Sequence, residues 1–87
     1  MADQFHLNII TPEKTVFDGQ IESLVAPGEL GYLGILAHHA TLVTTLVPGK
    51  ITFRTSPGET TSLNSKGRGF LEVSKNNAIL VLDSVES

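Results

Sequence analysis

The 87-residue sequence contains no cysteine and no tryptophan, and it has no long hydrophobic run. Without cysteine there is no disulfide and no thiolate ligand, whereas small secreted domains usually carry several disulfides, so a reducing compartment is favoured. No uncharged apolar stretch approaches the ~20 residues that a membrane-spanning helix needs. The first residues also lack the basic and then apolar pattern of a signal peptide. We therefore expect a soluble protein that is made where it works.

Basic residues are scarce as well. Six lysines and arginines stand against nine acidic residues, giving a net charge of −3, so we expect no nucleic-acid partner. Residues 1–49 contain five of the acidic side chains and one basic side chain, which reflects either chance or an acidic end that meets a basic partner. Lys66 and Arg68 flank Gly67 in a predicted tight turn, which we interpret as a solvated turn rather than as a phosphate site.

Sequence patterns of catalysis are absent. Gly49-Lys50 is followed by Ile51 instead of the serine or threonine that a phosphate-binding loop requires. The glycines at positions 28, 31 and 34 do not have the spacing of a dinucleotide-binding turn. A Gly-x-Ser-x-Gly motif, which presents a nucleophilic serine, does not occur. We expect no catalytic residue and no cofactor, so the protein is predicted not to be an enzyme.

The adjacent residues His38 and His39 are the best candidates for metal ligands. Neighbouring side chains on an extended chain point to opposite faces, and a zinc site needs three or four ligands. We therefore expect no metal, with one ring packed or hydrogen-bonded and the other exposed. A hydrolase would depend on His39 or Glu22, but nothing in the sequence holds Glu22 and Glu29 at a fixed separation.

Turn-forming residues divide the chain at short, regular intervals. The expected turns lie at Thr11-Pro12, Asp18-Gly19, Pro27-Gly28, Pro48-Gly49, Pro57-Gly58, Lys66-Gly67 and Lys75-Asn76-Asn77. The segments between them are too short for stable helices and have the length of strands. This pattern predicts an all-β fold, an antiparallel sandwich or barrel, and the chain length predicts a single domain over residues 1–87.

Hydrophobic alternation supports the strands. Apolar residues alternate with polar ones over 5–9 and 51–55, which predicts strands with one buried face. Residues 78–82 are apolar on both sides, as in a central strand or one covered by a partner. The segment 34–47 has both helical spacing and many β-branched residues, and we interpret it as a turn at His38-His39 followed by a strand over 41–46.

The segment 27–36 mixes glycines with large apolar side chains, an unusual composition for a loop. Its residues Leu30, Tyr32 and Leu33 must either fold inward as part of the core or form an adhesive tip, and the composition favours neither. Tyrosine is a favoured contact residue because it offers a large area and a polar end with little rotamer entropy.

Several segments, taken together in order, resemble the epsilon subunit of F-type ATP synthases. The matching segments are residues 5–19 (Phe5-His6-Leu7 through Phe17-Asp18-Gly19), 21–28 (Ile21-Glu22-Ser23-Leu24-Val25-Ala26-Pro27-Gly28), Gly31-x-x-Gly34-Ile35-Leu36, His39-Ala40, Leu42-Val43-Thr44, Leu46-x-Pro48-Gly49 and Gly69-Phe70-Leu71-Glu72-Val73. The resemblance covers essentially the whole chain. Its specificity comes from the order and spacing of the segments, since no single one is diagnostic.

The resemblance implies a flattened β-sandwich of about ten short strands, without the pair of C-terminal helices that the family usually adds. It implies a non-catalytic rotor subunit of the central stalk that links the gamma subunit to the c-ring and couples proton translocation to ATP synthesis. Membrane association would be indirect, on the cytoplasmic face of the bacterial inner membrane or, alternatively, on the stromal face of the plastid thylakoid. The competing hypothesis is a free-standing β-sandwich adaptor or ligand-binding module.

The resemblance also implies contact residues for both partners. Those expected at the c-ring are Glu29, Leu30, Gly31, Tyr32 and Leu33, and those expected at gamma are Thr11, His39, Leu42 and Thr44. The sequence departs from the family before His39, where Ala37-His38 replaces a usual Pro-Gly, and after Ala40, where Thr41 replaces a usual proline. The conformation around His39 is therefore an open point of the resemblance.

Overall fold

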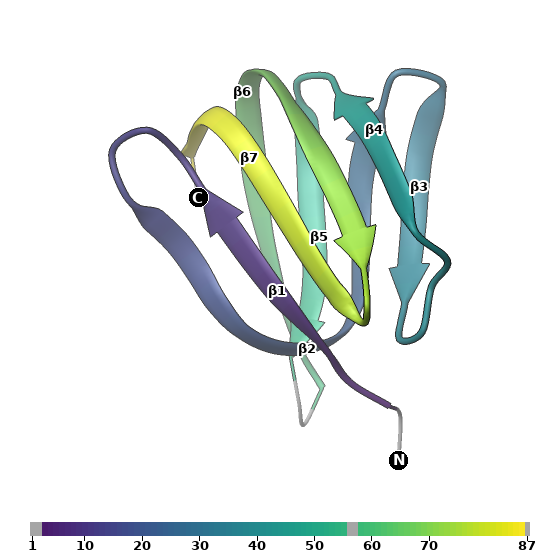
Figure 1. Ribbon diagram of the computed structural model, residues 1–87. Coiled ribbons are helices and arrows are strands. Elements are labelled where there is room, and N and C mark those ends of the chain that lie inside the picture. The colour runs from purple at the N-terminus through teal and green to yellow at the C-terminus, as the bar shows by residue number, and fades with distance from the viewer. Residues whose placement is uncertain (1–2, 56–57, 87) are drawn as a thin grey trace.

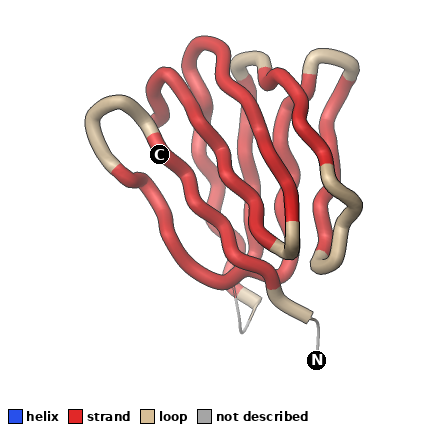
Figure 2. Tube along the Cα trace, viewed as in Figure 1, coloured by secondary structure: helices blue, strands red, loops and turns tan. Residues whose placement is uncertain are grey.

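The computed structural model describes residues 3–55 and 58–86, and this part of the chain consists of strands and turns (Figures 1 and 2). The seven strands are β1 (Phe5–Ile10), β2 (Thr15–Gly28), β3 (Gly31–Leu36), β4 (Leu42–Leu46), β5 (Gly49–Thr55), β6 (Glu59–Ser74) and β7 (Asn77–Glu86). Within the described residues, no helix is long and apolar enough to span a bilayer. The predicted all-β class is confirmed.

The strands pack as two layers, which confirms the predicted sandwich (Figure 1). The front layer contains the first half of β2, β1, β7, the second half of β6 and β4, which pair in that order. The back layer contains β3, the second half of β2, β5 and the first half of β6. Because β2 and β6 each pass from one layer to the other, hydrogen bonding is continuous around two corners of the sandwich.

The long strands explain why seven strands replace the ten that were expected. The predicted turns at Asp18-Gly19 and Lys66-Gly67 are wrong, because both dipeptides lie inside strands, whereas Pro27-Gly28 forms the end of β2 directly before the turn at 29–30. Pairing shifts register in β2 between Ile21 and Ser23 and in β6 between Lys66 and Gly69. An extra residue in one strand bends it without ending it, so each of these strands runs through a corner that was predicted to be a break.

Other predicted turns are confirmed. Thr11 and Lys14 exchange backbone hydrogen bonds of 2.9 and 3.3 Å across the β1–β2 connection, and residues 47–48 connect β4 to β5. Lys75 and Asn76 form the two-residue β6–β7 turn with φ values of 52° and 61°, the positive pair that a type I′ turn requires. The turn expected at Pro57-Gly58 includes a residue outside the described ranges.

The core lies between the layers and follows the predicted alternation. Its buried side chains are Phe5, Leu7, Ile9, Ile21, Leu24, Ala26, Ile35, Leu46, Ile51, Phe53, Leu63, Leu71, Val73, Ala78, Leu80 and Leu82. The strand expected at 78–82 is central in the front layer, since β7 pairs with β1 on one side and β6 on the other. The pairing with β1 is parallel, whereas the other described pairings are antiparallel.

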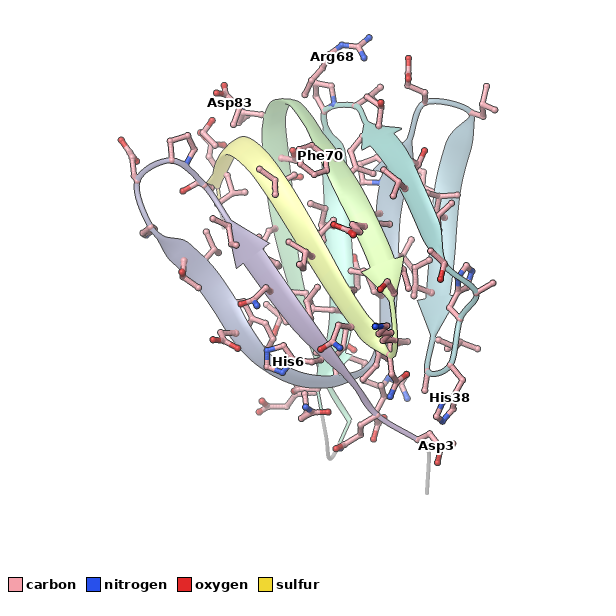
Figure 3. All side chains as sticks on the ribbon, viewed as in Figure 1. Asp3, His6, His38, Arg68, Phe70 and Asp83 are labelled. Carbon is pink, nitrogen blue, oxygen red and sulfur yellow. The ribbon has the colours of Figure 1, made fainter. Side chains whose placement is uncertain are left out.

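The sandwich has two distinct ends. The end that we call the tip end carries the connections at 11–14, 29–30 and 47–48 and the corner of β6 at 66–69. The opposite end, called the base end, carries the β3–β4 connection at 37–41, the β6–β7 turn and Asp3. Figure 3 shows Arg68 and Asp83 at the tip end and His38 and Asp3 at the base end.

Candidate interaction surfaces

The segment 27–36, expected to be a loop, is mostly a β-hairpin. Strands β2 and β3 pair from Ser23 with Leu36 up to Gly28 with Gly31, so only Glu29 and Leu30 form the turn. The glycines do not break β3: the strand pairs with β2 along its whole length, and its side chains alternate between inward and outward positions. The loop prediction was therefore wrong for most of its length.

The two hypotheses for the apolar residues of this segment apply to different side chains. Leu33 points inward and packs against the core. Leu30 is fully exposed at the turn, with 104% of its reference area accessible, and Tyr32 is 60% exposed on the outer surface of the back layer. The hairpin therefore has an apolar tip on a stem that is anchored in the core.

Three contacts join this hairpin to strands from elsewhere in the sandwich. The Val47 amide donates to the Pro27 carbonyl at 2.9 Å, and the Lys50 amide donates to the Tyr32 hydroxyl at 3.2 Å. At the turn itself, an Arg68 guanidinium nitrogen lies 3.5 Å from a Glu29 carboxylate oxygen. The hairpin is thus held by the β4–β5 connection, by β5 and by β6. Leu30 therefore lies at the end of a hairpin that is attached to the rest of the sandwich.

Acidic residues of the first half of the chain do not gather at one end. Each of three acids has a basic partner nearby: Asp3 with His38 at 3.2 Å, Asp18 with His6 at 2.5 Å, and Glu29 with Arg68 at 3.5 Å. Asp3 lies at the base end and Glu29 at the tip end. The arrangement gives no support to the hypothesis of an acidic end.

The four residues expected at gamma lie in different parts of the molecule. Thr11 is buried at the tip end, where its hydroxyl donates to the Lys14 carbonyl at 3.2 Å, whereas His39 is exposed at the base end. Leu42 packs against the core, and Thr44 shares the inner side of β4. The structure therefore brings only Leu42 and Thr44 close together, on the side of β4 that faces inward.

The outer side of the front layer carries an apolar surface, which the two apolar sides of 78–82 indicated on β7 but which sequence reasoning missed on β4 and β6. We call it the front patch: Val43, Phe70, Ile79 and Val81, arranged around Glu72. Val43 and Ile79 are the cross-strand neighbours of Glu72, and Val81 is a neighbour of Phe70. Val43 is 67% exposed and Phe70 is 45% exposed (Figure 3). Alternation along β4 and β6 could have revealed this patch, because its residues occupy the positions between core residues.

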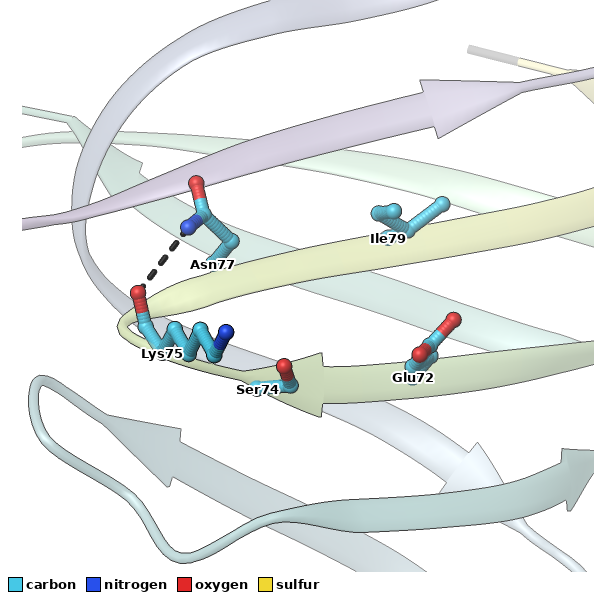
Figure 4. Close-up of a pocket in the computed structure, with 5 residues that line it drawn as sticks. All are labelled: Glu72, Ser74, Lys75, Asn77 and Ile79. Atoms are coloured by element: carbon cyan, nitrogen blue, oxygen red, sulfur yellow. Dashed lines mark hydrogen bonds between the residues drawn. The ribbon is translucent and has the colours of Figure 1, made fainter.

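The front patch continues toward the base end into a shallow open pocket of about 260 Å³ (Figure 4). Its lining residues are Glu72, Ser74, Lys75, Asn77 and Ile79. The Asn77 side-chain nitrogen Nδ2 donates to the Lys75 carbonyl at 2.9 Å, so this side chain belongs to the β6–β7 turn. The pocket places polar groups beside the apolar patch, which is the usual composition of an interface rim.

The backbone just before His39 adopts a left-handed conformation, which glycine tolerates best. His38, at the position where the resemblance expects glycine, has a φ of 65°. Its backbone amide donates to the Asn76 side-chain oxygen at 2.7 Å, and the Asn76 side-chain nitrogen Nδ2 donates to the Gln4 carbonyl at 2.9 Å. Contacts at the base end thus compensate for the left-handed backbone that a non-glycine residue adopts at a cost.

The two adjacent histidines have separate partners. The His38 ring lies against Asp3, and the His39 ring hydrogen-bonds through Nδ1 to the Ala40 carbonyl at 2.7 Å. The expectation was one ring packed or hydrogen-bonded and the other exposed; in the structure both rings are exposed and both have a hydrogen-bond partner, so neither is packed. Among the described residues, no three histidine or acidic side chains gather where they could hold a metal ion.

Comparison with known proteins identifies the class of this sandwich. The sequence profile of the ATP synthase Delta/Epsilon chain, beta-sandwich domain, matches residues 4–87. The chain therefore belongs to this family, as the resemblance predicted.

Among individual relatives, the ATP synthase epsilon chain of Dichelobacter nodosus is 39% identical over 83 residues, which are 95% of this chain and 57% of the relative. That of Desulforamulus reducens is 42% identical over 86 residues, which are 99% of this chain and 64% of the relative. The chain thus spans little more than half to two thirds of the length of these relatives.

Solved structures share the fold at low sequence identity. A chain of the Euglena gracilis mitochondrial ATP synthase, from an OSCP/F1/c-ring structure, superposes with a TM-score of 0.88 at 18% identity and covers 94% of this chain and 52% of its own. A chain of the Tetrahymena thermophila mitochondrial ATP synthase, from a central stalk/c-ring structure, gives 0.80 at 14% identity, with 97% and 66% covered. At these identities the likeness concerns the fold.

Proposed function

We propose that this chain acts as the β-sandwich part of a non-catalytic rotor subunit of an ATP synthase, linking the gamma subunit to the c-ring. Membership of the Delta/Epsilon family and epsilon-chain relatives at about 40% identity support this proposal. In this role the chain performs no bond chemistry and belongs to a membrane-associated complex. The bacterial relatives favour the cytoplasmic face of the inner membrane over the stromal face of a plastid thylakoid.

The observation that carries the proposal is the exposed Leu30 on its anchored hairpin. A large apolar side chain held away from the protein gains free energy when a partner covers it, and interface anchors are typically side chains of this kind. We assign contact with the c-ring to Glu29, Leu30, Gly31 and Tyr32, with Leu33 as the residue that anchors their strand in the core. Rigid attachment of the hairpin suits an element that must transmit torque.

The contact with gamma is proposed to involve β4 and the front patch. Of the residues expected there, His39 offers an exposed ring, and Leu42 and Thr44 support the surface from the inner side of β4, whereas Thr11 lies apart in the β1–β2 connection. The outward residues beside them, Val43 and Phe70, present the apolar area that a stable interface needs. Glu72 in the middle of this area favours a partner surface with a basic group opposite it.

Replacing Leu30 with serine tests the contact with the c-ring. The variant should fold normally and lower proton-driven ATP synthesis in membranes reconstituted with the enzyme. Leu36→Ser is the matched control, because Leu36 is 64% exposed at the far end of β3, the strand that follows the turn. Equal ATP synthesis in the two variants would overturn the assignment of the tip end to the c-ring.

Replacing Val43 with glutamate tests the contact with gamma. A second carboxylate beside Glu72 should weaken co-purification with a tagged gamma subunit by like-charge repulsion and by loss of apolar area. Thr60→Glu adds the same charge to an exposed position on β6 in the back layer and should leave co-purification unchanged. If the wild-type chain does not co-purify with gamma, the free-standing adaptor becomes the better hypothesis.

A further inference from the structure

Arg68 lies at the corner where β6 passes from the back layer to the front layer. The pairing register of β6 with β7 shifts between Lys66 and Gly69. Gly67 has a φ of 82°, a conformation that favours glycine. A Cβ on Gly69 would lie 2.2 Å from the Val81 carbonyl oxygen, so β6 and β7 approach closely there. The backbone on both sides of Arg68 is therefore fixed, and its long side chain projects from a defined point at the tip end (Figure 3).

The backbone of this corner is connected in register to the hairpin turn. Gly69 pairs with Leu46 of β4, and Leu46 pairs with Gly28 of β2. Arg68 and Glu29 are the next residues outward from the two ends of this row, and their side chains meet at 3.5 Å. The pair thus links the corner of β6 to the hairpin turn across β4, through the turn residue Glu29. The other two contacts, Val47 with Pro27 and Lys50 with Tyr32, hold the two strands of the hairpin.

The pair contributes little to folding stability. Both side chains are more than half exposed, at 65% for Arg68 and 51% for Glu29, and ion pairs in such positions are screened by solvent. An exposed two-residue turn, however, has few contacts that fix its orientation. A tether from a rigid corner restricts the turn and so limits the orientations in which Leu30 meets a partner.

We propose that Arg68 is a positioning residue for the partner-contact hairpin, holding the 29–30 turn through Glu29 in the orientation that the c-ring binds. The proposal rests on the function proposed above, because it takes the tip end as the surface that meets the c-ring. Arg68 itself acts through Glu29 and does not contact the partner.

The test measures binding of the full chain to purified c-ring in detergent micelles, at low and high salt, together with thermal stability. The variants are Arg68→Glu, Glu29→Arg and the double charge swap. Arg54→Glu is the matched control, because Arg54 is exposed on β5 in the half of that strand nearest the base end. The two tip variants should each raise Kd about threefold to tenfold at low salt, and less at high salt.

The double swap should bind more tightly than either single tip variant, since it re-forms the pair with the charges exchanged, although the contact of residue 29 with the c-ring stays altered. All four variants should keep the wild-type Tm. A double swap that binds no better than the single variants overturns the proposal, because each charge would then act on the partner directly. Binding equal to that of Arg54→Glu in both single variants also overturns it. Absence of binding by the wild-type chain contradicts the proposed function instead, so the two failures are distinguishable.

Discussion

The tip end and the base end of the sandwich are held by different kinds of contact. At the base end, Asn76 makes two side-chain hydrogen bonds to backbone groups, one to His38 and one to Gln4. At the tip end, the turn residue Glu29 is held by an ion pair between exposed side chains. The bond to His38 is exposed, but the bond to Gln4 is partly buried, and such hydrogen bonds contribute to folding, whereas exposed ion pairs contribute little.

This difference indicates a division of labour. The base end joins the N-terminal segment, the β3–β4 connection and the β6–β7 turn, so its contacts determine whether three distant parts of the chain stay together. The tip end carries the fully exposed Leu30, and its ion pair determines how that residue is presented. Variants at the base end should therefore change stability, and those at the tip turn should change binding.

The largest expected effect is on the free energy of unfolding, and it arises at the tip end from the backbone and not from the exposed side chains. Gly69→Ala should lower the free energy of unfolding by about 2 kcal/mol or more, because the added Cβ overlaps the Val81 carbonyl. Chemical denaturation measures this loss. Gly34→Ala is the control, since no atom lies within 4 Å of the position of its Cβ, and it should change stability by less than about 0.5 kcal/mol. Similar losses in both variants would contradict the close approach at Gly69.

The next effect tests the base end directly. Asn76→Ala removes two hydrogen bonds and leaves a side chain at a φ of 61°, so we expect a loss of about 2 kcal/mol. Asn76→Gly removes the same hydrogen bonds but tolerates the backbone, so its loss should be about half as large. Thermal unfolding compares the two. Wild-type stability in the alanine variant would remove the distinction between the ends.

A smaller effect of opposite sign is expected at His38. Replacing it with glycine relieves the left-handed backbone and removes the exposed contact with Asp3, and the net result should be a gain of about 0.5 kcal/mol. The adjacent substitution His39→Gly gains no such relief, since His39 is not among the residues of positive φ, and it should lower stability. A loss in both variants would show that the Asp3 contact outweighs the backbone strain.

The smallest expected effect on stability is that of Leu30→Ser. Its side chain is fully exposed, so the free energy of unfolding should change by less than about 0.5 kcal/mol even though binding falls. Leu33→Ser, on the same hairpin but packed against the core, should cost about 1 to 3 kcal/mol. Urea denaturation distinguishes them, and a comparable cost for Leu30 would contradict a tip that serves binding alone.

The sequence predicted the all-β class and the core because alternation reports burial directly. Phe5, Leu7 and Ile9 point inward as expected, and the strand at 78–82 is central. Turn dipeptides were a weaker guide. Asp18-Gly19 tolerates a strand because that half of β2 pairs with β1 alone, and Pro27 remains useful within its strand because its carbonyl accepts the Val47 amide.

For the interaction surfaces, the sequence pointed to the tip as one of two alternatives and to the β7 part of the front patch, but not to the part on β4 and β6. Leu30 and Tyr32 stood out because large apolar residues among glycines are unusual. Val43 and Phe70 did not stand out, because an outward apolar residue in a strand looks the same in sequence as an inward one until the register is known. The Glu29–Arg68 pair joins residues 39 positions apart and depends on pairing across β4, which local patterns do not encode.

The parallel pairing of β1 with β7 has a consequence for synthesis on the ribosome. Strand β1 is made first, but its front-layer neighbour begins only at Asn77. Until then, Leu7 and Ile9 lack the strand beside which they are buried, so the front layer forms only when nearly the whole sandwich has left the exit tunnel. Such long-range pairing slows folding and exposes early strands to misassembly, so a chaperone that covers the nascent N-terminal strand would protect this protein.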